Sequence, residues 1–326
     1  PFFLRELIER GHEHVVFFKQ ESLVTGKLTP LFETLKSCSI LLAPHLLAPL
    51  SGADGVSREL NILLSGVFNV GCLGVRNTQT ALHFLQWWDD RLQDHCRHDV
   101  VKGMHFEQRW LDLVPAYFDD VKFCRDPGIN VGHWNLPERE VRGDRHQLTV
   151  DGHPCRFVRF SGYDPANPDQ PTRYNQRLHA GNMGPIRKLF SSFHQQLIAA
   201  GFWETQTWWY SHSRFDNGVP IPAMAQQLFR EFENLPPQFE NPFATGSSSS
   251  YYHWLNTSSM TRAPKCDSFR LTPLWKAVYD IRPDLQAAFP NVENEDYARF
   301  HQWTIDYGLR ECGVPPEFLM ATPEIV

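Results

Sequence analysis

The sequence predicts an α/β fold in which a mixed sheet is layered with helices, followed by a mostly helical appendage. Short apolar runs alternate with amphipathic stretches over the first ~163 residues, which is the pattern of an α/β layer. Apolar residues make up 42% and charged residues 21% of the 326, a composition that supports a substantial core. Beyond about residue 205 the chain becomes aromatic and rich in turn residues. We therefore predict two domains, residues 1–205 and 206–326.

Four short apolar runs are the predicted strands of the sheet. They span residues 15–18, 39–43, 67–75 and 121–124. Later in the first domain, Asp151-Gly152 separates the segments "HQLTV" and "CRFVRF". Asp-Gly is a strong signal for a two-residue turn, so these two segments are predicted to form a β-hairpin.

Amphipathic segments between and after these runs are the predicted helices. The chain opens with one, "FFLRELIERG". The segment after Asn77-Thr78 carries apolar residues at helical spacing, and either residue can cap it. A further helix is predicted to begin at Pro185 and to stop at Gly201. From Pro273 onward the spacing predicts short helices.

Charge, cysteines and hydropathy argue against several classes of protein. A net charge of −6 argues against a general nucleic-acid binder, which normally carries a basic surplus. Seven scattered cysteines without a CxxC pair indicate free thiols in a reducing compartment, so a cytoplasmic protein is expected. No apolar run reaches the ~18 residues of a membrane span. Because the chain starts at Pro1 inside a predicted helix, we expect the natural N-terminus to lie upstream.

The first predicted strand ends abruptly in polar residues. The apolar run 15–18 is followed directly by Lys19-Gln20-Glu21. Taken alone, this segment is a surface turn with mixed charges. A functional interpretation needs polar partners from elsewhere in the first domain.

The sequence offers such partners at several places. In the strand at 67–75, Asn69-x-Gly71 puts a small residue where another group can approach closely. Glu107-Gln108 place an acid and an amide in an otherwise aromatic segment. The remaining candidates are His45 after the second strand, Trp134 and Asn135 in "DPGINVGHWNL", and Arg159, Ser161 and Gly162 at the end of the last strand.

Together and in this order, these segments resemble the bacterial GT-A-type glycosyltransferases, related in layout to the retaining glycogenin and galactosyltransferase enzymes. The similarity covers almost the whole chain and includes "SREL", "ILLSGVFNVG", "DPGINVGHWNL", "FSGYDP", "RFDNGVPIP" and "RPDLQAAFP". The resemblance implies a Rossmann-like GT-A sheet and transfer of a sugar from a nucleotide-sugar donor to a glycan acceptor. It also implies a role in bacterial surface polysaccharide or lipopolysaccharide assembly, beside other domains or subunits of that system. The strands that grip the nucleotide base would lie upstream of the chain.

Against this family the sequence departs at the metal site. Lys19 and Glu21 occupy the two positions of its Asp-x-Asp motif, and Arg159 replaces the histidine that is a further metal ligand. Mg²⁺ or Mn²⁺ is typical of the family, but here Glu21 is at most the one remaining ligand. The resemblance assigns Glu107 and Gln108, in the place of its Asp-Gln pair, as catalytic. It assigns donor binding to Lys19, Glu21, His45, Asn69, Gly71, Trp134, Asn135, Arg159, Ser161 and Gly162.

Two interpretations of the replaced ligands stay open. Lys19 and Arg159 can take over the ion's charge beside a diphosphate leaving group, giving a metal-independent transferase. Alternatively, the site has decayed and the domain is a catalytically inactive scaffold or interaction module. In either case a family member should gather Glu21, Asn69, Glu107, Trp134 and Ser161 around one cleft.

Overall fold

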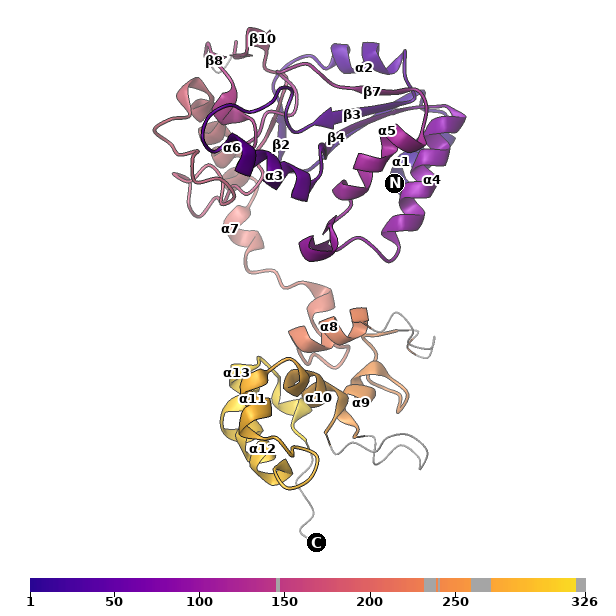
Figure 1. The fold of residues 1–326 in the computed structure, drawn as a ribbon, viewed down its shortest axis with the longest axis vertical. Coiled ribbons are helices and arrows are strands. Elements are labelled where there is room, and N and C mark those ends of the chain that lie inside the picture. Colours follow the sequence, from indigo (N-terminus) through magenta and orange to yellow (C-terminus); the bar gives the residue numbers. More distant parts are fainter. Residues whose placement is uncertain (145–146, 232–238, 240, 259–270, 321–326) are drawn as a thin grey trace. The chain divides into compact units, whose positions relative to one another are not determined.

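The computed structural model describes the chain except for residues 145–146, 232–238, 240, 259–270 and 321–326. The chain forms two compact units, Pro1–Thr205 and Gln206–Val326 (Figure 1). The candidate site residues named above all belong to the first unit.

A four-stranded mixed sheet is the centre of the first unit. Its strands lie in the order β1 (His14–Phe18), β4 (Phe68–Arg76), β3 (Ile40–Pro44) and β7 (Val121–Phe123). β1 and β3 each pair with β4 antiparallel, whereas β3 and β7 are parallel. The predicted α/β fold with a mixed sheet is therefore confirmed, and each of the four predicted runs overlaps one of these strands to within a residue or so at either end.

Helices cover both faces of this sheet. α1 (Phe2–Glu9) and α4 (Gln79–Leu92) share one apolar cluster with Ile40 and Leu42, whereas α2 (Thr29–Leu35) shares another with Leu41. Successive residues of β3 thus point to opposite faces, as strand geometry requires. The cap of α4 is Thr78, whose side chain accepts a hydrogen bond from the amide of Ala81.

The prediction of a hairpin between "HQLTV" and "CRFVRF" is wrong about the second strand. Asp151-Gly152 does make a turn, with positive φ angles of 50° and 78°, but it joins only β9 (Thr149–Val150) to β10 (His153–Pro154). The next strand, β11 (Phe157–Arg159), pairs antiparallel with β2 (Ser22–Val24), a strand that the sequence does not signal. This long-range pairing places Arg159 opposite Ser22, directly after the polar end of β1.

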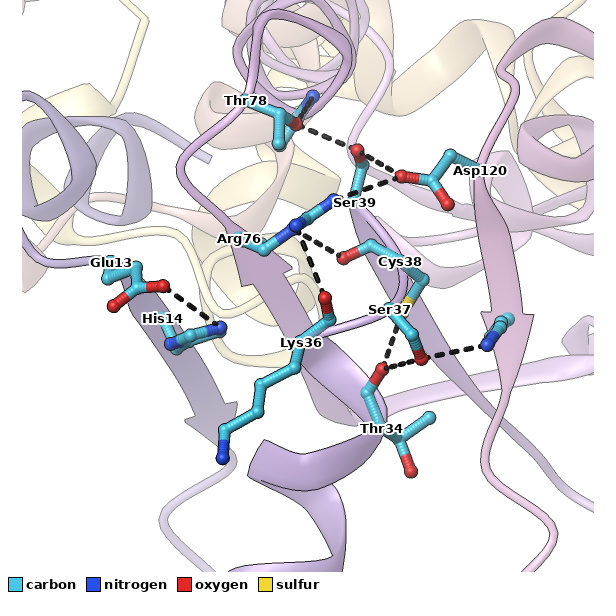
Figure 2. A network of polar contacts seen from close by, with 12 residues as sticks. Glu13, His14, Thr34, Lys36, Ser37, Cys38, Ser39, Arg76, Thr78 and Asp120 are labelled. Atoms are coloured by element: carbon cyan, nitrogen blue, oxygen red, sulfur yellow. Dashed lines mark hydrogen bonds and ion pairs between the residues drawn. The ribbon is translucent and has the colours of Figure 1, made fainter.

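A polar network fastens the edge of the sheet where β4 ends and β3 and β7 begin (Figure 2). Arg76, the last residue of β4, donates to the carbonyls of Cys38 and Lys36 and lies 3.4 Å from Asp120. Ser39 donates to the same Asp120 carboxylate at 2.8 Å. These contacts hold the three strands in register at this edge, while the opposite ends of β3 and β4 border the candidate site.

Further helices and strands belong to the first unit. They are α3 (Gly55–Ser65), β5 (His98–Asp99), β6 (Met104–His105), a 3-10 helix (Gln108–Leu113), α5 (Val114–Tyr117), β8 (Val141–Arg142), α6 (Arg187–Ala199) and α7 (Phe202–Thr205). α6 begins after a 3-10 turn that contains Pro185 and ends before Gly201.

The second unit consists of short helices around an aromatic core. They are α8 (Ala223–Glu231), α9 (Tyr251–Asn256), α10 (Pro273–Asp280), α11 (Pro283–Ala288), α12 (Tyr297–Trp303), a π-helix (Thr304–Gly308) and α13 (Leu309–Glu311). Trp275, Phe300 and Phe318 are buried at its centre. Within the described part of the chain, each helix is too short or too polar to traverse a lipid bilayer.

Candidate functional site

The first unit contains a cleft of about 990 Å³ where β1 and β3 end and β4 begins. Side chains from the four-stranded sheet, from β11 and from α3 line it. Eight residues selected from the sequence lie on its surface: Lys19, Glu21, His45, Asn69, Gln108, Trp134, Arg159 and Ser161. Of the five residues expected around one cleft, four line it, and the fifth, Glu107, contacts it through Lys19.

The polar end of β1 links the four-stranded sheet to the antiparallel pair of β2 and β11. Lys19-Gln20-Glu21 runs directly from β1 into β2, so Glu21 arrives beside the end of β11. The amide of Phe160 donates to the carbonyl of Glu21 at 2.8 Å. The Glu21 carboxylate then lies 2.5 Å from Nη2 of Arg159. The long-range pairing of β2 with β11 therefore makes this ion pair.

Arg159 is held on two sides at the floor of the cleft. Its Nη1 donates to Oδ1 of Asn69 at 2.9 Å, in addition to the bond with Glu21, and its side chain is only 3% exposed. Burial lowers the pKa of this guanidinium, and the charge of Glu21 opposes that shift. Its Nε is a buried donor without a hydrogen-bond partner among the described residues, as is Nε1 of Trp134.

Gly71 makes room for this guanidinium. A Cβ at position 71 would lie 1.1 Å from Nη1 of Arg159 and 2.5 Å from Oδ1 of Asn69. The close approach that Asn69-x-Gly71 predicts therefore occurs, and the group that approaches is the Arg159 side chain. Gly71 itself lies beneath the arginine, so its assignment to donor binding stays a prediction without a surface contact to support it.

Lys19 has a carboxylate partner of its own. Its Nζ lies 2.6 Å from Oε1 of Glu107, and both side chains are partly exposed. Each of the two cations that replace metal ligands is therefore paired with one carboxylate, Lys19 with Glu107 and Arg159 with Glu21. The four charges sum to zero before any ligand arrives.

Both ends of the Gln108 side-chain amide form hydrogen bonds with the main chain. Its Oε1 accepts from the amide of Val70 at 3.1 Å, and its Nε2 donates to the carbonyl of Ser65 at 2.8 Å. The side chain thus bridges β4 to the end of α3. In this arrangement Gln108 stabilises the wall of the cleft. Its catalytic assignment stays a prediction.

Two neutral histidines lie beside the floor. His45 is buried and accepts from Nδ2 of Asn69 at 2.9 Å through Nε2, while Nδ1 faces the carbonyl of Val67. Burial lowers the pKa of His45 to about 3 and that of His133 to about 4. Asn135 is buried behind them, where its Nδ2 donates to the carbonyl of His45 at 3.1 Å. It supports the cleft without lining it.

Ser161 and Gly162 have different places at the other wall. Ser161 lines the cleft, and its carbonyl accepts from the Thr172 hydroxyl at 2.8 Å. Gly162 has a φ of 77°, and a Cβ there would lie 2.5 Å from the ring of Tyr174. Gly162 therefore permits a turn that seats Tyr174 in the wall. The structure gives it no other contact with the cleft.

Sequence reasoning missed much of the outer wall. α3 contributes Ser57, Arg58 and Asn61, and their helical spacing forms a polar stripe that could have been recognised. Arg58 lies 2.5 Å from Glu138, which also binds Arg177 at 3.2 Å. The hairpin of β5 and β6 adds His98, His105 and Phe106.

The side chains present do not fit a divalent cation at the end of β1. Mg²⁺ and similar ions need several oxygen ligands in a defined geometry. Glu21 supplies a carboxylate there, but Arg159 binds it, and Lys19 lies beside Glu107. Throughout the described ranges, no group of three or more His, Cys, Asp or Glu side chains gathers to hold a metal ion.

The chain is similar in sequence to two proteins that are described as uncharacterized. No protein-family model matches it. It is 26% identical over 167 residues to the uncharacterized Bacillus subtilis protein YfnF, covering 50% of the chain and 54% of that protein. YfnD of the same organism is 27% identical over 101 residues, 30% of the chain and 32% of that protein. The chain therefore matches about half of the length of YfnF and about a third of the length of YfnD.

Among solved structures, the galactosyltransferase LgtC in complex with donor and acceptor sugar analogues is similar to part of the chain. The alignment covers 60% of this chain and 66% of that one, with 16% identity and a TM-score of 0.36.

Proposed function

We propose that the first unit is a glycosyltransferase domain that binds a nucleotide-sugar donor and transfers its sugar to a glycan acceptor without a divalent ion. The observation that carries this proposal is the convergence of eight motif residues, drawn from six separate segments, on one cleft. The motif order supports a role in bacterial surface polysaccharide or lipopolysaccharide assembly. Such a role would involve a cytoplasmic enzyme acting beside other components of that system.

The chemistry would rest on Lys19 and Arg159. A departing nucleoside diphosphate gains negative charge, which a positive group nearby stabilises. One unit-charge pair at 4 Å contributes about 1 kcal/mol in water and about 4 kcal/mol at intermediate dielectric. Lys19 has three N–H donors, and Glu107 engages its ammonium at one oxygen, so hydrogen bonds remain for a phosphate. The paired carboxylates reduce the net attraction, and we expect a modest contribution from each cation.

A second candidate function follows from the same contacts. Glu21 and Glu107 already neutralise the two cations, and Gln108 already bonds to the main chain at both ends. A site arranged in this way also suits a domain that keeps the fold for interaction with partners and performs no transfer. Donor binding and turnover separate these two candidates.

Isothermal titration of the chain with a panel of nucleotide sugars tests the proposal. We expect the same donor affinity in EDTA and in Mg²⁺, because the charges of the site belong to side chains. Arg159→Ala should weaken donor binding by about 1.5–3 kcal/mol, the value of a charged hydrogen bond. Arg156→Ala is the matched control, because Arg156 pairs with Asp126 at 3.0 Å and does not line the cleft.

Three results would contradict the metal-independent transferase. They are a donor affinity that EDTA abolishes, an Arg159→Ala variant with unchanged affinity, and no binding at millimolar donor. The last result, together with absence of nucleoside diphosphate release in an activity assay, would favour the interaction module.

A further inference from the structure

The rim of the cleft carries three aromatic rings from one hairpin. β5 and β6 pair antiparallel with His98 opposite His105, and Phe106 follows immediately. The ring centroids are 5.2 Å apart for His98 and His105, 5.4 Å for His98 and Phe106, and 5.5 Å for His105 and Phe106. All three residues line the cleft. Together they form one aromatic surface beside the Lys19–Glu107 pair.

Phe106 occupies this position at a conformational cost. Its φ is 49°, in the left-handed region that bulky residues rarely adopt. Its amide donates to the carbonyl of Arg97 at 2.9 Å, which fixes the backbone there. The side chain nevertheless remains 44% exposed. An apolar ring held in a strained backbone and left half in solvent is not explained by core packing, and such strain concentrates at functional positions.

The surroundings of the three rings match a sugar ring better than a charged group. The face of an aromatic ring is electron-rich and attracts the C–H groups on one side of a pyranose. α3 packs beside β6, and its Ser57 and Asn61 offer a hydroxyl and an amide to sugar hydroxyls within the same cleft. Burial and the neighbouring His98 lower the pKa of His105, so this ring is neutral near pH 7.

Depth in the cleft distinguishes this surface from the proposed donor site. Arg159 and Asn69 are buried at the floor, whereas Phe106 is half exposed at the rim. A phosphate would bind at the charged floor, and a neutral ring arriving from solution would meet the rim. We propose that Phe106, supported by His98 and His105, is a stacking subsite for a pyranose ring of the glycan acceptor. The assignment of this pyranose to the glycan acceptor rests on the proposed function, whereas the binding of a pyranose at Phe106 does not.

Saturation-transfer NMR on the donor-free chain tests this subsite, with methyl β-galactopyranoside and methyl β-glucopyranoside as probes. At least one glycoside should bind at millimolar concentration and receive saturation mainly on one face of its ring. Phe106→Ala should weaken binding about tenfold, the upper range for one aromatic contact, and Phe106→Trp should retain it. Phe32→Ala on α2 removes another exposed phenylalanine away from the cleft and should change nothing.

A glycine variant separates the ligand effect from damage to the fold. Phe106→Gly removes the ring and also relieves the left-handed backbone, so it should lose glycoside binding without lowering the thermal midpoint. No glycoside binding by the unmodified chain, or equal affinity in Phe106→Ala, would overturn the proposal. Binding of uridine or guanosine that depends on Phe106, without glycoside binding, would instead assign the rings to a nucleobase. Ring-dependent glycoside binding without any donor binding would retain the subsite and reject the transferase.

Discussion

Replacing Gly71 by alanine should displace Arg159 and unfold the first unit more easily. The added Cβ would lie 1.1 Å from Nη1 and 2.4 Å from Cζ of the guanidinium. These atoms cannot yield by a few tenths of an ångström, because Glu21 and Asn69 hold the group on two sides. The guanidinium must therefore leave its place and break both hydrogen bonds.

The magnitude follows from the burial of the two partners. Breaking a buried ion pair costs about 3–5 kcal/mol when the remaining charge cannot reach water. Arg159 is almost fully buried, but the Glu21 side chain is 30% exposed and can be hydrated again, which favours the lower end. Alanine also lowers the backbone entropy lost on folding by about 0.5–1 kcal/mol relative to glycine. We expect a net loss of about 2–3 kcal/mol in the free energy of unfolding.

Urea titration followed by hydrogen exchange with mass spectrometry is the suitable assay, because it reports on peptides of the first unit separately. Gly74→Ala is the matched control on the same strand. Its Cβ would meet the ends of Leu35 at 3.0–3.1 Å and Cβ of Leu41 at 3.2 Å, so a smaller loss of about 1 kcal/mol is expected once the same gain in backbone entropy is subtracted. In an Arg159→Ala background, Gly71→Ala should cost less than it does alone, because the guanidinium is gone and only the Asn69 side chain, with Oδ1 2.5 Å from the added Cβ, has to shift. An equal cost in both backgrounds would refute the reasoning.

Two further predictions concern protons and metal ions. His45 and His133 have pKa values lowered to about 3 and about 4, so below pH 6.5 the unfolded chain binds protons that the folded chain does not. Stability should therefore fall as the pH decreases from 6.5 to 5, by about 1.6 kcal/mol for each histidine, and His45→Gln should flatten this slope in urea titrations. An unchanged slope in that variant would contradict the assignment. The triple change Lys19→Asp, Glu21→Asp and Arg159→His should make donor binding dependent on Mn²⁺, measured by titration with and without EDTA, whereas continued indifference to EDTA would remove the replacement hypothesis.

Strand positions were readable from the sequence because apolar runs bounded by polar residues are local features. For the same reason the cap of α4 was readable as Asn77 or Thr78, and the structure selects Thr78. The pairing of β2 with β11 was not, since β2 has three residues and no periodicity of its own. The Asp151-Gly152 turn chemistry was correct, but turn residues do not determine which later strand pairs across the domain.

For the site, the resemblance selected the residue positions but not their interactions. The partner of Lys19 is 88 positions away and that of Arg159 is 138 positions away, so only the folded register brings each carboxylate to its cation. Phe106 was missed because a left-handed φ at a phenylalanine leaves no trace in composition or spacing. The tight fit at Gly71 was foreseen as a close approach, without identifying the group that approaches.

The two ion pairs also limit which amino-acid substitutions this cleft can accept during evolution. Arg159→His alone would leave Glu21 without its cation, and Lys19→Asp alone would set a second carboxylate against Glu107. A side chain at position 71 could be gained only after Arg159 is lost. Each single step thus passes through a chain with an unbalanced charge or a collision, while paired steps keep the balance. The four charged residues and Gly71 would therefore be inherited or lost together.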